Sequence, residues 1–245
     1  MKFKVLLIGL LLFAMPITQA QEFGFGIRGG LNTYSIGDIN SRGGSISSGQ
    51  PDELFSPVKD MGFQAGAYFV AQFGKLYVRP ELNYVSSKNH YDFPQQQANW
   101  TTSKIDLPIL VGYDIVGPVS VYAGPGFNFF GDTEIDGVQQ TSFTTGTPGP
   151  DLEKTTFNVN VGVTFKFKYI GIDLRYEMGQ GETAEELEDF VRSSYGVNLA
   201  DLRPYKPNVL SLSIFVDLFR TDTGNIGNFF TGLFKSDKCY CPYNK

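Results

Sequence analysis

Charge, histidine and cysteine are scarce in this chain of 245 residues. Only 18% of the residues are charged, whereas soluble domains carry roughly 25%. The formal net charge of -5 argues against a nucleic-acid-binding protein, because such proteins present a basic surface. The two cysteines, Cys239 and Cys241, lie in the extreme C-terminal tail, far in sequence from the single histidine, His90. We therefore expect neither a disulfide framework nor a bound metal or other cofactor.

The body of the chain also lacks long apolar runs. An α-helix needs about 20 apolar residues to cross a bilayer, and no such run occurs after the N-terminal segment. That segment has a basic start, an apolar stretch over residues 5–15 and a small-residue end at Ala20. This layout is typical of a secretory signal peptide. We expect the mature chain to begin at Gln21 and to be exported to a bacterial envelope.

Aromatic residues and glycine are abundant instead, and beyond residue 22 the sequence follows a period of two, which is the period of a β-strand. Phe63, Phe69 and Phe73, for example, share one parity with three alanines of the same run. This alternation predicts eight strands. The runs cover residues 23–32, 63–73, 76–84, 105–115, 119–129, 157–167, 170–178 and 210–218.

Short and long connections alternate between these runs. The short ones cover residues 74–75, 116–118 and 168–169, and the long ones about residues 37–60, 89–102, 132–154 and 180–206. In a two-residue hairpin the two flanking residues pair on one face of the sheet. Phe73 should therefore pair with Leu76, and Phe167 with Ile170.

One face of each predicted strand is apolar, and the other combines glycine with charges of both signs. A soluble, lipocalin-like barrel would place the apolar face inside, whereas an outer-membrane barrel places it against lipid. Glycine weakens strands but suits a crowded interior, and opposite charges satisfy one another inside a closed barrel. We therefore predict an all-β fold, namely an eight-stranded antiparallel up-and-down transmembrane β-barrel with short periplasmic turns and long extracellular loops.

The predicted organisation has three parts. Residues 1–20 form the signal peptide, residues 21–219 the outer-membrane β-barrel domain and residues 220–245 a periplasmic C-terminal tail. The tail has an apolar segment over residues 225–234, which fits either a helix at the membrane interface or a docking peptide.

The stretch over residues 104–130, KIDLPILVGYDIVGPVSVYAGPGFNFF, resembles the signature of the PorT-like outer-membrane β-barrel family of Bacteroidetes. The shared features are an acidic-Leu-Pro-hydrophobic strand, a short turn and a strand carrying Tyr-x-Gly-Pro-x-Gly. The segments over residues 26–32 and 77–84 fit as well, so that the resemblance covers about residues 23–219. It implies the barrel fold and the outer membrane. The family's namesake is implicated in the type IX secretion and gliding apparatus, a role that barrel motifs alone do not transfer.

Eight charged residues on the glycine-rich face form the main candidate site. Their functional interpretation is an ion or proton path, and their structural interpretation is a plug of salt bridges. We favour the plug, because eight strands leave an interior that side chains just fill. The residues are Arg28, Arg79, Glu81, Asp106, Lys166, Asp173, Arg175 and Glu177, with Arg28, Arg79 and Glu81 expected at the centre.

The fourth long loop contains a helix-start signal. Thr183 and Glu186 have the spacing of a capping box, and Leu187, Phe190 and Val191 follow as an apolar stripe. We predict a short amphipathic helix over the barrel mouth that extends to about residue 195. Its apolar stripe would either pack on the rim or bind a partner.

The resulting expectation is a non-enzymatic barrel with a binding or scaffolding role at the cell envelope. Its partners would be outer-membrane lipid and other envelope proteins, reached through the extracellular loops or the tail, for example in a secretion or surface complex. One alternative is a narrow channel for small solutes. Another is a hydrolase at the outer rim that uses His90, although no recognisable serine nucleophile motif stands beside it.

Overall fold

The structure, a computed structural model, describes residues 22–43, 52–139, 150, 152–221 and 224–225. The predicted signal peptide, nearly all of the C-terminal tail, Cys239 and Cys241 lie outside the described residues. No helix in the described part is long and apolar enough to cross a membrane.

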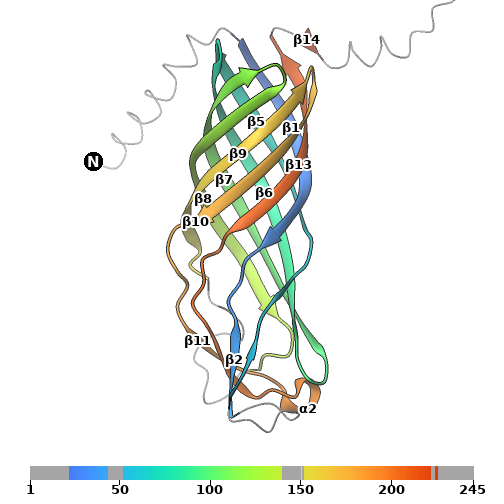
Figure 1. The fold of residues 1–245 in the computed structure, drawn as a ribbon, viewed down its shortest axis with the longest axis vertical. Coiled ribbons are helices and arrows are strands. Elements are labelled where there is room, and N and C mark those ends of the chain that lie inside the picture. The colour runs from blue at the N-terminus through green and yellow to red at the C-terminus, as the bar shows by residue number, and fades with distance from the viewer. Residues whose placement is uncertain (1–21, 44–51, 140–149, 151, 222–223, 226–245) are drawn as a thin grey trace, which may run out of the picture.

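Eight long strands dominate the described part of the chain, and Figure 1 shows them slanting around a common axis. The prediction of an all-β, antiparallel fold is confirmed. The strands are β1 (Glu22–Tyr34), β5 (Gly62–Phe73), β6 (Leu76–Asp92), β7 (Gln97–Val116), β8 (Val119–Ile135), β9 (Thr155–Phe167), β10 (Ile170–Gly179) and β13 (Val209–Arg220).

Each of these strands pairs with the next one in chain order, and β13 pairs back onto β1. The closing ladder includes Leu31 opposite Leu212 and Arg28 opposite Phe215. The two-residue strands β4 (Val58–Lys59) and β14 (Gly224–Asn225) join the same sheet beside β6 and β13, so that it counts ten strands among the described residues. The pairing of β1 with both β5 and β13 means that the sheet closes on itself.

The short turns lie where the sequence predicted them. The turns after β5, β7 and β9 occupy residues 74–75, 117–118 and 168–169, and each contains a residue in the left-handed region. Gly74, Gly117 and Lys168 have φ angles of 64°, 56° and 52°. Such positive φ angles are typical of tight hairpin turns. The predicted pairs of Phe73 with Leu76 and of Phe167 with Ile170 are confirmed.

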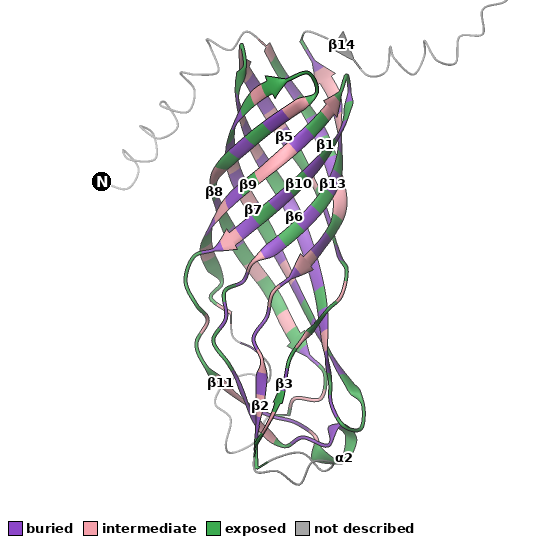
Figure 2. Cartoon of the chain, in the orientation of Figure 1, coloured by how far each residue is buried: buried purple, intermediate pink, exposed green. Residues whose placement is uncertain are grey.

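Exposed and buried residues alternate along the strands (Figure 2). The exposed residues include most of the large apolar ones, and the buried residues include many polar and charged ones. Leu31 and Leu212 are 52% and 53% exposed, whereas Asn128 and Asn160 are fully buried. In water such exposure of large apolar side chains would be unfavourable, so this surface requires an apolar solvent.

The glycines of the inner face accommodate aromatic rings. Gly112 stands opposite Tyr77, and Gly162 stands opposite Tyr122. A Cβ atom on either glycine would overlap the tyrosine ring across from it. The same arrangement joins Gly26 with Tyr68 and Gly171 with Phe215. The interior is crowded, as expected from the glycine content, because aromatic rings pack directly against these glycines. We call these the ring-on-glycine contacts.

Strands β6, β7 and β8 continue well past the predicted runs. The sequence predicted a loop over residues 89–102, but β6 extends to Asp92 and β7 begins at Gln97. The alternation of apolar and polar residues continues in these extensions, but here the apolar side chains are buried. Tyr91, Ala98 and Trp100 are fully buried. They belong to a second core beyond the ring.

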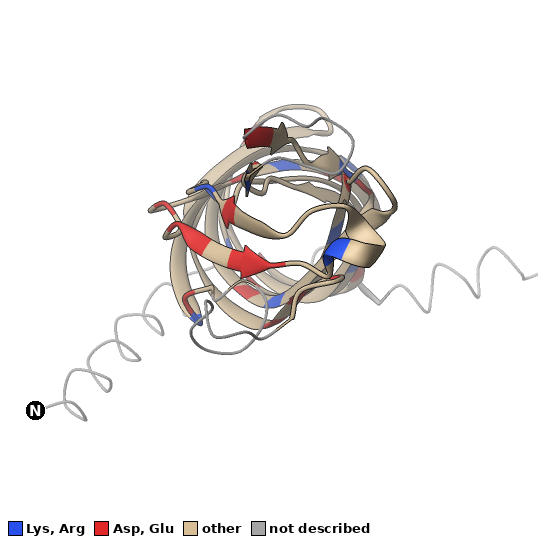
Figure 3. Cartoon of the chain, turned by 90° about the horizontal axis from the view of Figure 1, so that it is seen from below, with Lys and Arg blue, Asp and Glu red and all other residues tan. Residues whose placement is uncertain are grey.

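This second core lies within a folded structure at the long-loop end, which we call the cap. A separate sheet of β11 (Glu186–Asp189), β12 (Leu199–Leu202), β2 (Ile39–Arg42) and β3 (Asp52–Phe55) forms part of it. Phe93 contacts Phe55 and Phe190 edge-on, with ring centroids 4.9 Å and 5.0 Å apart. Burial raises the pKa of Tyr205, so this phenol stays neutral. Seen from the long-loop end, segments of the cap cross the opening of the ring (Figure 3).

The predicted helix in the fourth loop is wrong. Residues Glu186–Asp189 form strand β11, and helix α2 is a single turn over Arg192–Tyr195. Thr183 does not cap a helix, because its hydroxyl accepts a hydrogen bond from the Tyr205 backbone N–H at 3.1 Å.

The apolar stripe of that loop packs into the cap instead of lying along one face of a helix. Phe190 is fully buried in the cap, Val191 packs against the same core and Leu187 is half-buried in β11. The tertiary core of the cap overrode the local helix signal.

The ring-on-glycine contacts generate a stability prediction. Gly162→Val should lower the free energy of unfolding by about 1–3 kcal/mol, because the new side chain displaces the Tyr122 ring in a packed interior. Thermal unfolding in detergent, followed by circular dichroism, measures the effect. Gly29→Val is the matched control, since its nearest neighbour to a new Cβ is the Gln64 carbonyl oxygen at 3.7 Å. Equal melting temperatures for the two variants would contradict the role assigned to Gly162.

Candidate functional site

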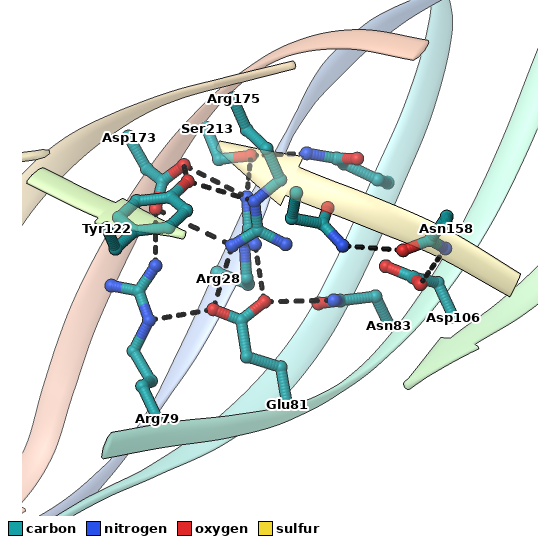
Figure 4. A network of polar contacts seen from close by, with 12 residues as sticks. Arg28, Arg79, Glu81, Asn83, Asp106, Tyr122, Asn158, Asp173, Arg175 and Ser213 are labelled. Atoms are coloured by element: carbon teal, nitrogen blue, oxygen red, sulfur yellow. Dashed lines mark hydrogen bonds and ion pairs between the residues drawn. The ribbon is translucent and has the colours of Figure 1, made fainter. Parts of the chain in front are cut away.

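Five charged residues meet at the middle of the barrel interior, and we call them the central cluster (Figure 4). Arg28 comes from β1, Arg79 and Glu81 from β6, and Asp173 and Arg175 from β10. Their inward parity brings them together across the lumen, although they are as far apart as 147 positions by their numbers in the sequence.

Glu81 is the hub of the central cluster. Its carboxylate pairs with Arg28 Nη1 at 2.6 Å, with Arg79 Nε at 2.8 Å and with Arg175 Nη2 at 2.9 Å. Asp173 pairs with Arg79 Nη2 at 2.6 Å. All five side chains are at most 6% exposed, so these charges depend on one another and not on water.

Neutral groups add hydrogen bonds to the central cluster. Tyr122 donates to Asp173 at 2.6 Å and accepts from Arg175 Nε at 2.9 Å. Asn83 donates to Glu81 at 3.0 Å, and Arg28 donates to Ser213 at 3.0 Å. A buried ionic network is favourable only when its remaining donors and acceptors are satisfied in this manner.

Arg79 is also enclosed by aromatic rings. Its guanidinium carbon lies 5.0 Å from the ring centroid of Tyr122 and 5.7 Å from those of Tyr68 and Phe215. Cation–π attraction in a dry site adds to the ion pairs with Glu81 and Asp173.

A second group lies closer to the cap. Lys104 pairs with Glu177, which also accepts from Asn128 at 2.8 Å. Asp106 accepts from Asn158 at 3.1 Å. Asp106 and Glu177, which the sequence grouped with the central residues, therefore belong to a separate set. Lys104 was not included in the predicted site because the predicted run begins one residue later, at residue 105. Its parity is nevertheless that of the inward-facing residues.

A third group lies toward the short turns. Lys166 pairs with Asp217 at 2.5 Å, and Tyr68 donates to the same carboxylate at 2.5 Å. Arg220 also contacts Asp217, at 3.5 Å. Lys166 is thus remote from the central cluster, and its partner Asp217 was recognisable from the sequence by its inward parity in the last strand.

A cavity of about 280 Å³ opens at the short-turn end of the barrel, and we call it the vestibule. Arg79, a member of the central cluster, is one of the residues that line it. Its walls combine apolar and charged residues, among them Tyr68, Val70, Tyr77, Asp114, Lys166, Phe215, Asp217 and Arg220.

His90 lies outside the ring, in the extension of β6. Its Nδ1 atom is 2.7 Å from Asp60 and its Nε2 atom 3.7 Å from Asp92. Both ring nitrogens therefore face carboxylates. In the described part of the chain no group of three or more histidine, cysteine or acidic side chains could hold a metal ion.

The closed antiparallel sheet, its apolar outer surface and its ionic interior define an integral β-barrel of the outer membrane. The chain belongs to the family described as the outer membrane protein beta-barrel domain, whose model matches residues 5–200. The predicted location in the outer membrane is confirmed by this family membership. A comparison with curated proteins found no match.

Solved structures of three proteins align with about 80% of this chain. OprG from Pseudomonas aeruginosa is 15% identical, with 81% of this chain and 98% of that chain covered and a TM-score of 0.46. Neisserial surface protein A is 14% identical, with coverages of 80% and 98% and a TM-score of 0.41. Ail of Yersinia pestis, in complex with a heparin analogue, is 13% identical, with coverages of 80% and 99% and a TM-score of 0.36.

The central cluster generates a second stability prediction. Arg79→Ala should lower the free energy of unfolding by about 3–5 kcal/mol, because it removes one partner from two buried carboxylates. The melting temperature of the detergent-solubilised barrel measures the loss. Arg42→Ala is the control, since Arg42 pairs with Asp201 on the cap with its side chain 57% exposed, and exposed pairs stabilise little. An unchanged melting temperature for Arg79→Ala would show that the central cluster is not a stabilising plug.

Proposed function

We propose that this protein is a plugged, non-enzymatic barrel that binds or scaffolds other molecules at the cell envelope. In this proposal β1, β5, β6, β7, β8, β9, β10 and β13 are its eight membrane-spanning strands, the short turns face the periplasm and the cap faces the cell exterior. The central cluster is the observation that carries the proposal, because five buried charges fill the lumen at its middle. The protein would then act through its two ends.

The barrel is obstructed at two levels. The central cluster closes the inner side of the vestibule, and the cap covers the opposite opening with a core that includes Trp100, Phe190 and Tyr205. Neither obstruction is a single flexible loop, since the first is an ion-pair network and the second a folded hydrophobic core. This double closure favours binding or scaffolding over the alternative of a narrow solute channel.

The cap offers the larger surface for a partner. Its sheet brings together strands from the first and fourth long loops, and acidic residues are prominent on it in Figure 3. The segment over residues 104–130 that resembles the PorT-like family forms the β7–β8 hairpin within the wall. An accessory role in a secretion or surface complex, in a bacterium of the Bacteroidetes, is the form of the proposal that this resemblance supports.

The hydrolase alternative depends on His90. The described contacts of its ring are the Asp60 and Asp92 carboxylates, which suit a structural link between β4 and β6. A general base would need hydrogen-bond contact with a nucleophile or a water. His90→Ala should therefore leave the cellular phenotype of a deletion strain fully complemented, and a loss of complementation at normal expression would favour the enzyme.

Conductance separates the plug from the channel. The purified full chain in a planar bilayer should give no stable conductance above the background of the bilayer. Asp173→Asn serves as the comparison, because it weakens the central cluster at nearly constant volume. Steady unitary conductance of the wild-type protein would refute the plugged barrel.

Partner capture tests the scaffolding role itself. The tagged native protein, extracted in mild detergent and purified at low salt, should bring specific envelope proteins with it. A matched bait with Arg42→Ala and Leu54→Ala alters the cap surface but not the lumen, since both side chains are exposed there. Mass spectrometry compares the two baits. Recovery of the barrel alone in both preparations would contradict a role as a complex subunit.

A further inference from the structure

The barrel wall is interrupted beside the central cluster. Between β5 and β6 the ladder pairs Tyr68 with Glu81 and Ala71 with Val78 in one constant register. Among these described residues, the two positions in between are unpaired on each strand. The register is the same on both sides, so the interruption is a gap in the ladder and not a bulge.

The next pair of strands repeats this interruption. Between β6 and β7 the pairing stops at Pro80 with Ile109 and resumes at Asn83 with Asp106. The intervening residues, all within the described part, have no ladder partner across this interface. The second gap therefore begins directly where the first one ends along β6.

A third gap follows between β7 and β8. Pairing stops at Pro108 with Gly126 and resumes at Val111 with Ala123, so Leu110 lacks a described ladder partner on β8. Together the three gaps form one slanted line across four neighbouring strands, which we call the seam. By contrast, the ladder between β9 and β10 runs without interruption from Phe167 and Ile170 to Asn158 and Gly179.

Three prolines account for the seam. Each gap contains one proline, and proline has no backbone N–H to donate to a neighbouring strand. Each proline retains its pair on the following strand and loses the one on the preceding strand. The retained pairs are Pro80 with Ile109, Pro108 with Gly126 and Pro125 with Val159.

The first gap of the seam lies in the wall of the vestibule. Val70 and Arg79, which are opposite one another in the first gap, both line the vestibule. On the inner side of the seam Val70, Tyr77, Leu110 and Tyr122 pack as an apolar cluster. On the outer side Leu82 is 55% exposed and faces lipid. Here the vestibule and the bilayer are separated by a wall without a complete backbone ladder.

We propose that the seam opens sideways and admits small apolar molecules dissolved in the bilayer into the vestibule. Because local opening begins where the fewest backbone hydrogen bonds must break, the seam is the part of the wall that opens first. The apolar cluster on the inner side of the seam offers apolar surface to such a ligand. The route is lateral, so it exists whether or not the barrel conducts along its axis.

The central cluster would act as the closure of this seam. Arg79 and Glu81 flank Pro80 on β6 and reach across the lumen to Asp173 and Arg175 on β10. These ion pairs hold β6 in place where its backbone ladder is incomplete. Opening therefore depends on side-chain pairs that can break and re-form without unfolding the barrel.

Photolabelling in vesicles tests the proposal. Adamantyl diazirine, a small apolar photoreactive molecule, is added to phosphatidylcholine vesicles that contain the full chain, and labelled residues are mapped by mass spectrometry. We expect labelling of Tyr77 and Phe215 inside the vestibule. The variant with Pro80→Val, Pro108→Val and Pro125→Val restores three donors and should reduce this labelling at least about threefold. The control is Pro118→Val, which changes a vestibule proline in a turn outside the seam.

Two outcomes would overturn the proposal. Equal vestibule labelling in the wild type and the triple variant would mean that the probe enters through the open end, and no vestibule labelling would mean that no route exists. Hydrogen–deuterium exchange of the wild type supplies a test that does not depend on the triple variant folding. Peptides that cover the seam should exchange faster than peptides of β9 and β10, and equal protection would remove the seam as a point of opening.

Discussion

Glu81 and Asp173 hold three arginines at the centre of the barrel, and the remaining features of the interior depend on this arrangement. Burying five charges in a space without water is costly unless nearly every charge has a partner. The pairs come from β1, β6 and β10, so they also fix how opposite walls of the barrel face one another. The central cluster thus ties three strands of the ring together across the lumen.

Glycine and proline set the geometry around the plug. Gly112 and Gly162 allow tyrosine rings to lie against the wall, and those rings line the space beside Arg79. Pro80 and Pro108 remove backbone donors from the strands that carry the plug. Over a short length of the wall, some backbone hydrogen bonds between strands are therefore missing, and side-chain contacts hold the strands together there. This arrangement links the stability of the central cluster to the integrity of the wall next to the vestibule.

The ring of strands was largely predictable, because every strand contacts a different medium on each face. Lipid outside and packed polar groups inside impose a strict period of two, which fixed the short turns and the parity of Arg28, Arg79 and Glu81. Parity also assigned Asp106, Glu177 and Lys166 to the interior. The parity of a residue does not say how far along the barrel axis its side chain lies. The division of these charges into three groups was therefore not predictable.

The sequence by itself determined which residues face inward, where the hairpins turn and that the outer surface is apolar, since these follow from neighbours one or two positions apart. Only the tertiary structure decided which charges pair, because partners such as Glu81 and Arg175 approach across the lumen. The tertiary structure also determined how the long loops fold into the cap. The helix signal at Thr183 is local, whereas the burial of Phe190 among residues of other loops is not, and the larger buried core prevailed.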